Sequence, residues 1–222
     1  CQYLVEKALG RDVSDPTSKL EWYDAEMQEC ADGYCSFVME QIAKAKEHCP
    51  DPLICIEQKL DYSKWVQDGF GTGDCVIVAD DTLHIIDFKY GLGVLVTASG
   101  EDSTGNSQLK CYALGALDTF GDLYDIKRIQ LSIYQPRRAH VDTFELSTEE
   151  LLKWADEILA PTARLAYEGG GEFHAGEHCR FCRIKATCRK RAAYSLELAK
   201  YEFAEAPSLS SEEIGIILPQ IE

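Results

Sequence analysis

The chain has 222 residues, of which 45% are hydrophobic and 27% are charged, a composition typical of a globular domain with one sizeable core. No apolar run approaches the roughly 18 residues of a membrane-spanning helix, so we expect a cytoplasmic protein with no membrane partner. The net charge of −16 counts against nucleic acid as a ligand, although Lys and Arg gather at 137–138 and over 180–191.

The N-terminal part is predicted to be helical. Residues 1–9 have the pattern of a helix with no capping residue before it, so we expect the native chain to start upstream of Cys1. A polar turn is predicted over 12–18. A long helix is then expected over 19–48, with Trp22 among its apolar contacts.

Three β-prone segments follow this helix. A first strand is predicted over 53–62 and a loop over 63–72. The next two strands, over 73–79 and 82–89, are separated by a two-residue turn and predict an antiparallel hairpin.

The hairpin brings two acidic residues together. Because the turn is two residues long, counting outward from it sets Asp74 opposite Asp87, with Cβ atoms roughly 5 Å apart. Lys89 lies on the same face, since strand side chains alternate. Two facing carboxylates repel unless a cation lies between them or one takes up a proton, which favours a Mg²⁺ or Mn²⁺ site. The alternative is that Asp87 and Lys89 form an ion pair that binds nothing.

The rest of the first 170 residues is predicted to alternate between helix and strand. A loop with four glycines, over 91–105, is expected to be mobile beside the end of the hairpin. The elements that follow are a helix over 108–120 opened by Asn106, a strand over 126–134 parallel to an earlier one, an edge strand over 140–146, and a helix over 147–167 that begins with a capping box.

Three further residues are candidates for the same site. Gln108 and Tyr112 are four residues apart, so they share one face of their helix, where an amide and a phenol could contact a DNA strand. The alternative is an ordinary amphipathic helix with Tyr112 packed under the sheet. Glu57, on the first strand, is either a third metal-binding carboxylate or an exposed strand glutamate.

Three of the ten cysteines have a distinctive spacing, Cys179-x2-Cys182-x5-Cys188, in a basic segment that follows three consecutive glycines. Thiolates at this spacing in a short loop converge on one point and predict a metal ion or an iron–sulfur cluster, which needs a fourth ligand. Six of the other cysteines lie in predicted helices or strands without paired spacing, and we expect them to be buried or free thiols.

In this order and spacing, the acid, the acid-x-lysine and the glutamine-x3-tyrosine resemble the motifs of the PD-(D/E)XK nuclease superfamily, specifically its RecB-type branch. The resemblance covers roughly residues 53–190. It implies an α/β fold with a restriction-endonuclease-like α-β-β-β-α-β core, in which a mixed central sheet is flanked by helices, plus a C-terminal cysteine-rich helical segment over 174–191. We expect one domain over 1–204 and a tail over 205–222.

The resemblance also implies an activity, that of a metal-dependent DNA exonuclease in phage or bacterial recombination or repair, with a recombination or single-strand annealing protein as a further partner. Lys89 would position the attacking water, and Gln108 and Tyr112 would guide the DNA strand. The ligands implied for Mg²⁺ or Mn²⁺ are Asp74, Asp87, the carbonyl of Phe88, and Glu57. The competing class is a non-catalytic DNA-binding or assembly module with a structural zinc or iron–sulfur site.

The cysteine trio is similar to that of the AddB and CRISPR-associated nucleases, in which an N-terminal cysteine completes a 4Fe-4S site. Cys1 is the formal candidate for that fourth ligand. Alternatively the fourth cysteine lies upstream, and the trio holds zinc with His174 or His178 as a substitute ligand. The histidine that this group carries on an N-terminal helix has no counterpart before Asp74, so we expect it to be upstream or absent.

Overall fold

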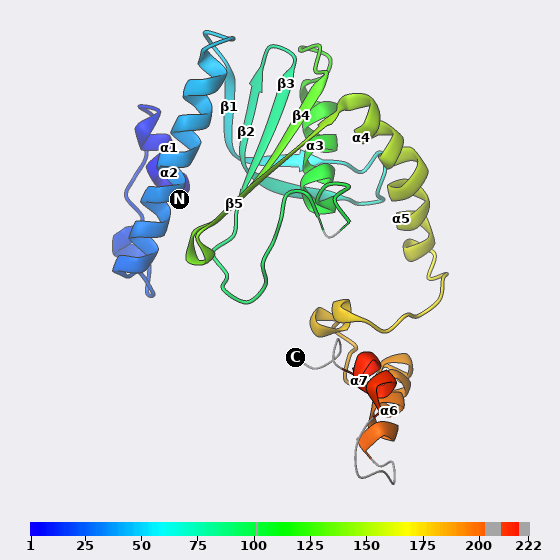
Figure 1. Cartoon of the computed structure of the whole chain (residues 1–222). Helices are drawn as coiled ribbons and strands as arrows, with labels where there is room; N and C mark the ends of the chain where they lie inside the picture. The colour runs from blue at the N-terminus through cyan, green and yellow to red at the C-terminus, as the bar shows by residue number, and fades with distance from the viewer. Residues whose placement is uncertain (101, 203–209, 218–222) are drawn as a thin grey trace. The chain divides into compact units, whose positions relative to one another are not determined.

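The computed structural model describes residues 1–100, 102–202 and 210–217. The chain forms two compact units, Cys1–Glu168 and Gly169–Glu222 (Figure 1). The division falls at a run of three glycines, of which Gly169 and Gly171 have φ values of 72° and 96°. That residues 1–204 form one domain stays a prediction.

A five-stranded sheet with the order β1-β2-β3-β4-β5 is the centre of the first unit. Its strands are β1 (Leu53–Asp61), β2 (Phe70–Ala79), β3 (Thr82–Phe88), β4 (Arg128–Gln135) and β5 (His140–Ser147). Neighbouring strands are antiparallel except for β3 and β4, which are parallel and are connected through α3 (Ser107–Phe120). The predicted mixed sheet with a parallel return strand and a fifth strand at its edge is confirmed, and Ala79 pairs with Thr82 as the hairpin turn required.

Helices cover both faces of the sheet (Figure 1). On one face α3 packs against the apolar side chains of β2, β3 and β4, while α1 (Gln2–Ala8) and α2 (Ala25–Lys46) pack against the other. Ile77 and Val78 are therefore both buried although they point to opposite faces, as expected for a strand with helices on each side. Each such side chain contributes about 1.5–3 kcal/mol of hydrophobic stabilisation.

The second predicted helix begins six residues later than expected. Asp24 caps α2 by accepting a 2.7 Å hydrogen bond from the backbone N–H of Met27, and this cap fixes the start of the helix at Ala25. Residues 17–19 instead form a short 3₁₀ turn. Trp22, predicted as an apolar contact of the helix, precedes it and is 79% exposed.

Strand β2 begins at Phe70, inside the segment predicted as a loop. Gly71 pairs with Leu60 of β1, and a Cβ atom on Gly71 would overlap the ring of Tyr112 on α3. Glycine therefore allows the helix to approach the strand closely, an arrangement that β-propensity alone does not reveal.

The capping box at the end of the sheet is confirmed. Ser147 and Glu150 exchange backbone and side-chain hydrogen bonds at the start of α4 (Thr148–Trp154). The predicted helix continues through a π-helical stretch (Ala155–Leu159) into α5 (Ala160–Tyr167).

The second unit contains short helical elements. They are a 3₁₀ turn (Glu177–Phe181), α6 (Arg189–Glu202) and α7 (Ser211–Ile217). Of the expected C-terminal tail, residues 205–209 and 218–222 lie outside the described residues. Within the described ranges no helix combines the length and apolar character needed to cross a membrane.

Candidate active site

Three acidic residues occupy one row across β1, β2 and β3. The β1–β2 ladder has pairs on both sides of Glu57 and Asp74 but does not include these two residues. The β2–β3 ladder likewise stops one step before Asp74 and Asp87, although the same register sets them against each other. Regular strand pairing is thus interrupted where the three carboxylates meet, and their burial increases from exposed Glu57 through half-buried Asp74 to buried Asp87.

Glu57 has a left-handed backbone conformation with φ of 52°. This conformation reverses the direction in which the following side chains of β1 point. Cys55 and Leu60 would lie on opposite faces of a regular strand, yet both pack into the core beneath α3. Such a conformation costs on the order of 1–3 kcal/mol for a residue other than glycine, and strain of this kind gathers at functional sites. No feature of the sequence predicted it.

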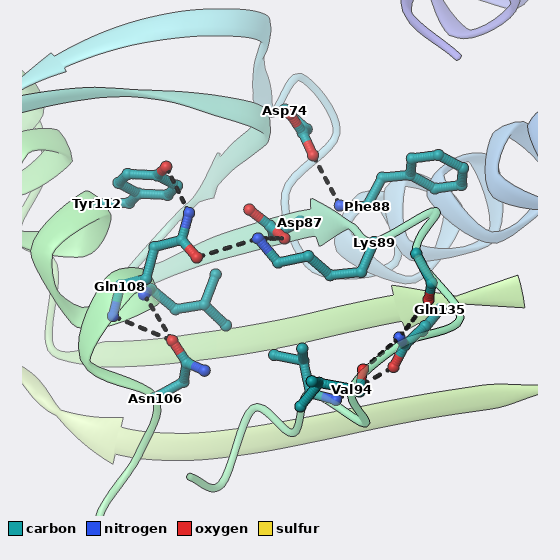
Figure 2. Close-up of polar contacts among 12 residues, drawn as sticks. Asp74, Asp87, Phe88, Lys89, Val94, Asn106, Gln108, Tyr112 and Gln135 are labelled. Atoms are coloured by element: carbon teal, nitrogen blue, oxygen red, sulfur yellow. Dashed lines mark hydrogen bonds and ion pairs between the residues drawn. The ribbon is translucent and has the colours of Figure 1, made fainter. Parts of the chain in front are cut away.

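Asp74 is fixed by the end of the neighbouring strand. Its Oδ2 atom accepts a 2.7 Å hydrogen bond from the backbone N–H of Phe88 (Figure 2). Burial raises the pKa of Asp74, and the hydrogen bond from Phe88 and the charge of Lys89 act in the opposite direction. The charge of Asp74 in turn adds to the burial that raises the pKa of Glu57 and of Asp87.

Asp87 is 4% exposed, and burial is the main cause that raises its pKa. The Nζ atom of Lys89 lies 2.9 Å from Asp87 Oδ2. The approach is outside hydrogen-bonding geometry, so this buried oxygen has an ionic partner but no hydrogen bond. Lys89 is the positively charged side chain that acts on both Asp74 and Asp87.

The donor set suits a hard divalent cation. Mg²⁺ and Mn²⁺ prefer carboxylate oxygens, and Mg²⁺ is held by one or two of them together with water and phosphate oxygens. Across the described part of the chain, no group of three or more His, Cys, Asp or Glu side chains is arranged to hold a metal ion. Asp74 and Asp87 offer the two carboxylates that Mg²⁺ can use, and Oδ2 of Asp87 is the oxygen that lacks a hydrogen bond.

A hydrogen-bonded chain connects the lysine to helix α3 (Figure 2). Lys89 Nζ donates to Oε1 of Gln108 at 3.0 Å, and Gln108 Nε2 donates to the hydroxyl of Tyr112 at 2.7 Å. Asn106 caps the helix by accepting from the N–H groups of Gln108 and Leu109. Gln108 and Tyr112 share one helix face as predicted, but the contact between Gln108 and Lys89 has no signal in the sequence.

The glycine-rich loop after β3 is attached to the start of α3 and to the strands β4 and β5. Asn106 Nδ2 donates to the carbonyl of Thr97, and Asp142 of β5 accepts from the backbone and hydroxyl groups of Ser99. Gln135, at the end of β4, is buried and hydrogen bonded to the same loop. Sequence reasoning missed Gln135 because an isolated glutamine in a strand carries no motif.

The cysteine trio lies in the second unit. Cys179, Cys182 and Cys188 are half-buried free thiols, and they are not arranged as a formed metal site. Cys1, the formal candidate for the fourth ligand, is an exposed thiol of the first unit. His178 is exposed, and its Nε2 atom lies 2.9 Å from the carbonyl oxygen of His174.

Comparison with known proteins gives a family but no activity. The family model described as "Protein of unknown function (DUF2800)" matches residues 1–222. A solved structure titled "Crystal structure of SSO0001" is similar at 11% identity and a TM-score of 0.31, over 86% of this chain and 94% of that chain. A score this low supports no argument, so the chemistry must be argued from the site.

Proposed function

We propose that this chain, which belongs to the DUF2800 family of proteins of unknown function, is a metal-dependent DNA exonuclease of phage or bacterial recombination or repair. The observation that carries the proposal is the buried oxygen of Asp87, which has a lysine beside it and no hydrogen bond. Lys89 supplies one positive charge to two facing carboxylates, and this arrangement is costly unless a further cation completes it. The sequence resemblance to RecB-type nucleases supports the same conclusion.

The metal would be held by the interrupted strand ends. Asp74 and Asp87 are the proposed ligands of Mg²⁺ or Mn²⁺, and the carbonyl of Phe88 and the carboxylate of Glu57 are the further oxygens of the site. When bound, such a cation lowers the pKa of water and neutralises charge on a phosphate.

The chain's own residues would then orient the reacting groups. An ammonium group has three N–H donors. Lys89 forms an ion pair with Asp87 and donates one hydrogen bond to Gln108. A remaining donor is available to hold the attacking water or a phosphate oxygen. Gln108 fixes the lysine, and Tyr112 fixes Gln108, so both act as positioning residues in addition to contacting the DNA strand.

For the second unit we propose a structural zinc ion or 4Fe-4S cluster held by Cys179, Cys182 and Cys188, with His174 or His178 in the same unit as a further nitrogen ligand for zinc. In the part of this unit that the structure describes, no side chain is buried. For a small unit whose described part buries no side chain, a metal site is a further source of stability. Iron, sulfide and zinc contents of anaerobically purified protein, with Cys182→Ser as the comparison, test this; equal metal in both proteins would refute it.

Incubation with linear and circular DNA tests the proposed activity. The exonuclease proposal expects degradation of linear DNA in Mg²⁺ or Mn²⁺, none in EDTA, and intact closed circles. Metal-independent binding with no cleavage under any condition would instead identify a non-catalytic DNA-binding module.

A further inference from the structure

A short loop directly after the proposed catalytic lysine exposes three apolar side chains. In this apolar loop, residues 90–95, the exposed fractions are 47% for Leu92, 41% for Val94 and 51% for Leu95. Burial of these side chains against a partner would gain free energy in proportion to their apolar area. The three side chains lie within four residues of one another and directly after the proposed catalytic lysine.

The backbone of the apolar loop is held by side chains from the end of β4 and the turn after it. Gln135 Nε2 donates to the carbonyls of Gly91 at 2.7 Å and Val94 at 2.9 Å, and its Oε1 accepts from the N–H of Val96 at 3.1 Å. Arg138 donates to two more carbonyls, those of Leu92 and Gly93. The exposed side chains are thus presented from an ordered backbone, which reduces the entropy lost when they bind.

The same strand end connects the apolar loop to the active site. The backbone N–H of Lys89 donates to the carbonyl of Tyr134 at 2.9 Å, and Tyr134 directly precedes Gln135. Figure 2 shows Gln135 and Val94 beside the ribbon that carries Lys89. The end of β4 therefore holds both the backbone of Lys89 and the backbone of the apolar loop.

We infer that the apolar loop binds unpaired nucleobases of the DNA strand whose phosphate lies at Lys89. The inference rests on the proposed nuclease function. Apolar side chains contact the faces of bases that are not stacked in a duplex, and such contacts are tolerant of sequence.

Charge is the reason that the protein would bind bases rather than rely on phosphates. A net charge of −16 repels a polyanion, and the carboxylate row adds negative charge at the site itself. Contacts with base faces gain affinity without depending on counterion release. Paired bases in a blunt duplex do not expose their faces, so the substrate class is DNA with a single-stranded end.

The test compares Leu92→Ser/Leu95→Ser with Leu123→Ser, which alters a leucine that is 77% exposed outside the loop. The probes are a fluorescent oligothymidine single strand and a blunt hairpin duplex, and binding is measured by anisotropy in EDTA so that no hydrolysis occurs. We expect the double variant to bind the single strand about tenfold more weakly, because two leucine side chains no longer bury apolar area against the bases. Its duplex binding, and both affinities of Leu123→Ser, should stay within twofold of the parent.

Three results would overturn the inference. They are unchanged single-strand binding by the double variant, equal weakening on both probes, and loss of self-association in light scattering without loss of DNA binding, which would make the loop a protein interface. The binding test can fail or succeed independently of the test for DNA cleavage. A parent protein that binds single strands through the loop but cleaves no DNA would refute the nuclease and retain the binding site.

Discussion

Lys89 and Gln108 are 19 residues apart in the chain and are joined by a 3.0 Å hydrogen bond between Nζ and Oε1. The bond links the end of β3 to the first turn of α3, and it holds the lysine beside Asp87. A flexible lysine loses several rotatable bonds of freedom when it is ordered, and this contact offsets part of that cost before any substrate arrives.

Gln108→Leu removes this contact and should reduce the rate of DNA cleavage by about 100-fold, because misplacement of a catalytic group by about 1 Å has an effect of that size. Tyr112→Phe keeps the ring and removes only the hydroxyl that accepts from Gln108, so its rate should fall by less. Single-turnover cleavage measures both. Gln130→Leu is the control, because Gln130 lies in β4 and is hydrogen bonded to Glu145. An equal loss of rate in Gln130→Leu would mean that the effect of Gln108→Leu does not come from its contact with Lys89.

Gly71→Ala tests the close approach of α3 to β2. The added Cβ atom would overlap the ring of Tyr112, so helix or ring must move, at a cost of about 1–3 kcal/mol in the free energy of unfolding. Gly91→Ala adds the same atom where nothing lies within 4 Å. Urea denaturation should show a lower midpoint only for Gly71→Ala, and similar midpoints for the two variants would contradict the packing described here.

Asp87→Asn should be at least as stable as the parent in EDTA. Burial already disfavours the charged form of this side chain, and the substitution removes one of two facing acids. Addition of Mn²⁺ should stabilise the parent, by about 2.7 kcal/mol at a hundredfold excess over the dissociation constant, and leave the variant unchanged. Thermal unfolding with and without Mn²⁺ measures this; exposed Asp118→Asn is the control and should respond like the parent.

His84 predicts a dependence of stability on pH that is independent of metal. The imidazole is buried, with Nε2 2.8 Å from the hydroxyl of Ser132, and burial lowers the pKa of His84 from 6.5 to about 3. Below pH 6.5 the unfolded chain takes up a proton that the folded chain does not, so stability falls as pH falls. The loss should reach about 2 kcal/mol at pH 5.

The comparison for this prediction is His84→Asn, which cannot take up that proton and should lose less stability between pH 6.5 and pH 5. His48→Asn alters an exposed histidine and should follow the parent. Parallel curves of the free energy of unfolding against pH for the parent and His84→Asn, measured by urea denaturation, would show that His84 does not cause the loss of stability.

The sequence predicted the sheet and its connections because those features depend on local patterns. A two-residue turn set the hairpin register, and alternation set the edge strand. The start of α2 was misplaced because apolar periodicity extends through Trp22, whereas the Asp24 cap determines where the helix can begin. Strand β2 was shortened because Gly71 is disfavoured in strands unless a neighbour requires its space.

The candidate site was predictable only in part, because some of its features depend on contacts between distant elements. Strand alternation is enough to place Asp74, Asp87 and Lys89 together. The left-handed conformation of Glu57 and the bond from Lys89 to Gln108 depend on contacts between elements distant in the chain. Neither leaves a local pattern that a single sequence can display.

The most direct test of the central claim is the rate at which labelled nucleotide is released from linear DNA in Mn²⁺ by the parent protein, Lys89→Met and Lys46→Met. Lys89→Met keeps the length of the side chain and removes the charge beside Asp87, while Lys46 is an exposed residue of α2. The account predicts metal-dependent release by the parent and by Lys46→Met, and a rate at least about 100-fold lower for Lys89→Met at saturating DNA. Release at the parental rate by Lys89→Met, or release by the parent that persists in EDTA, would contradict it.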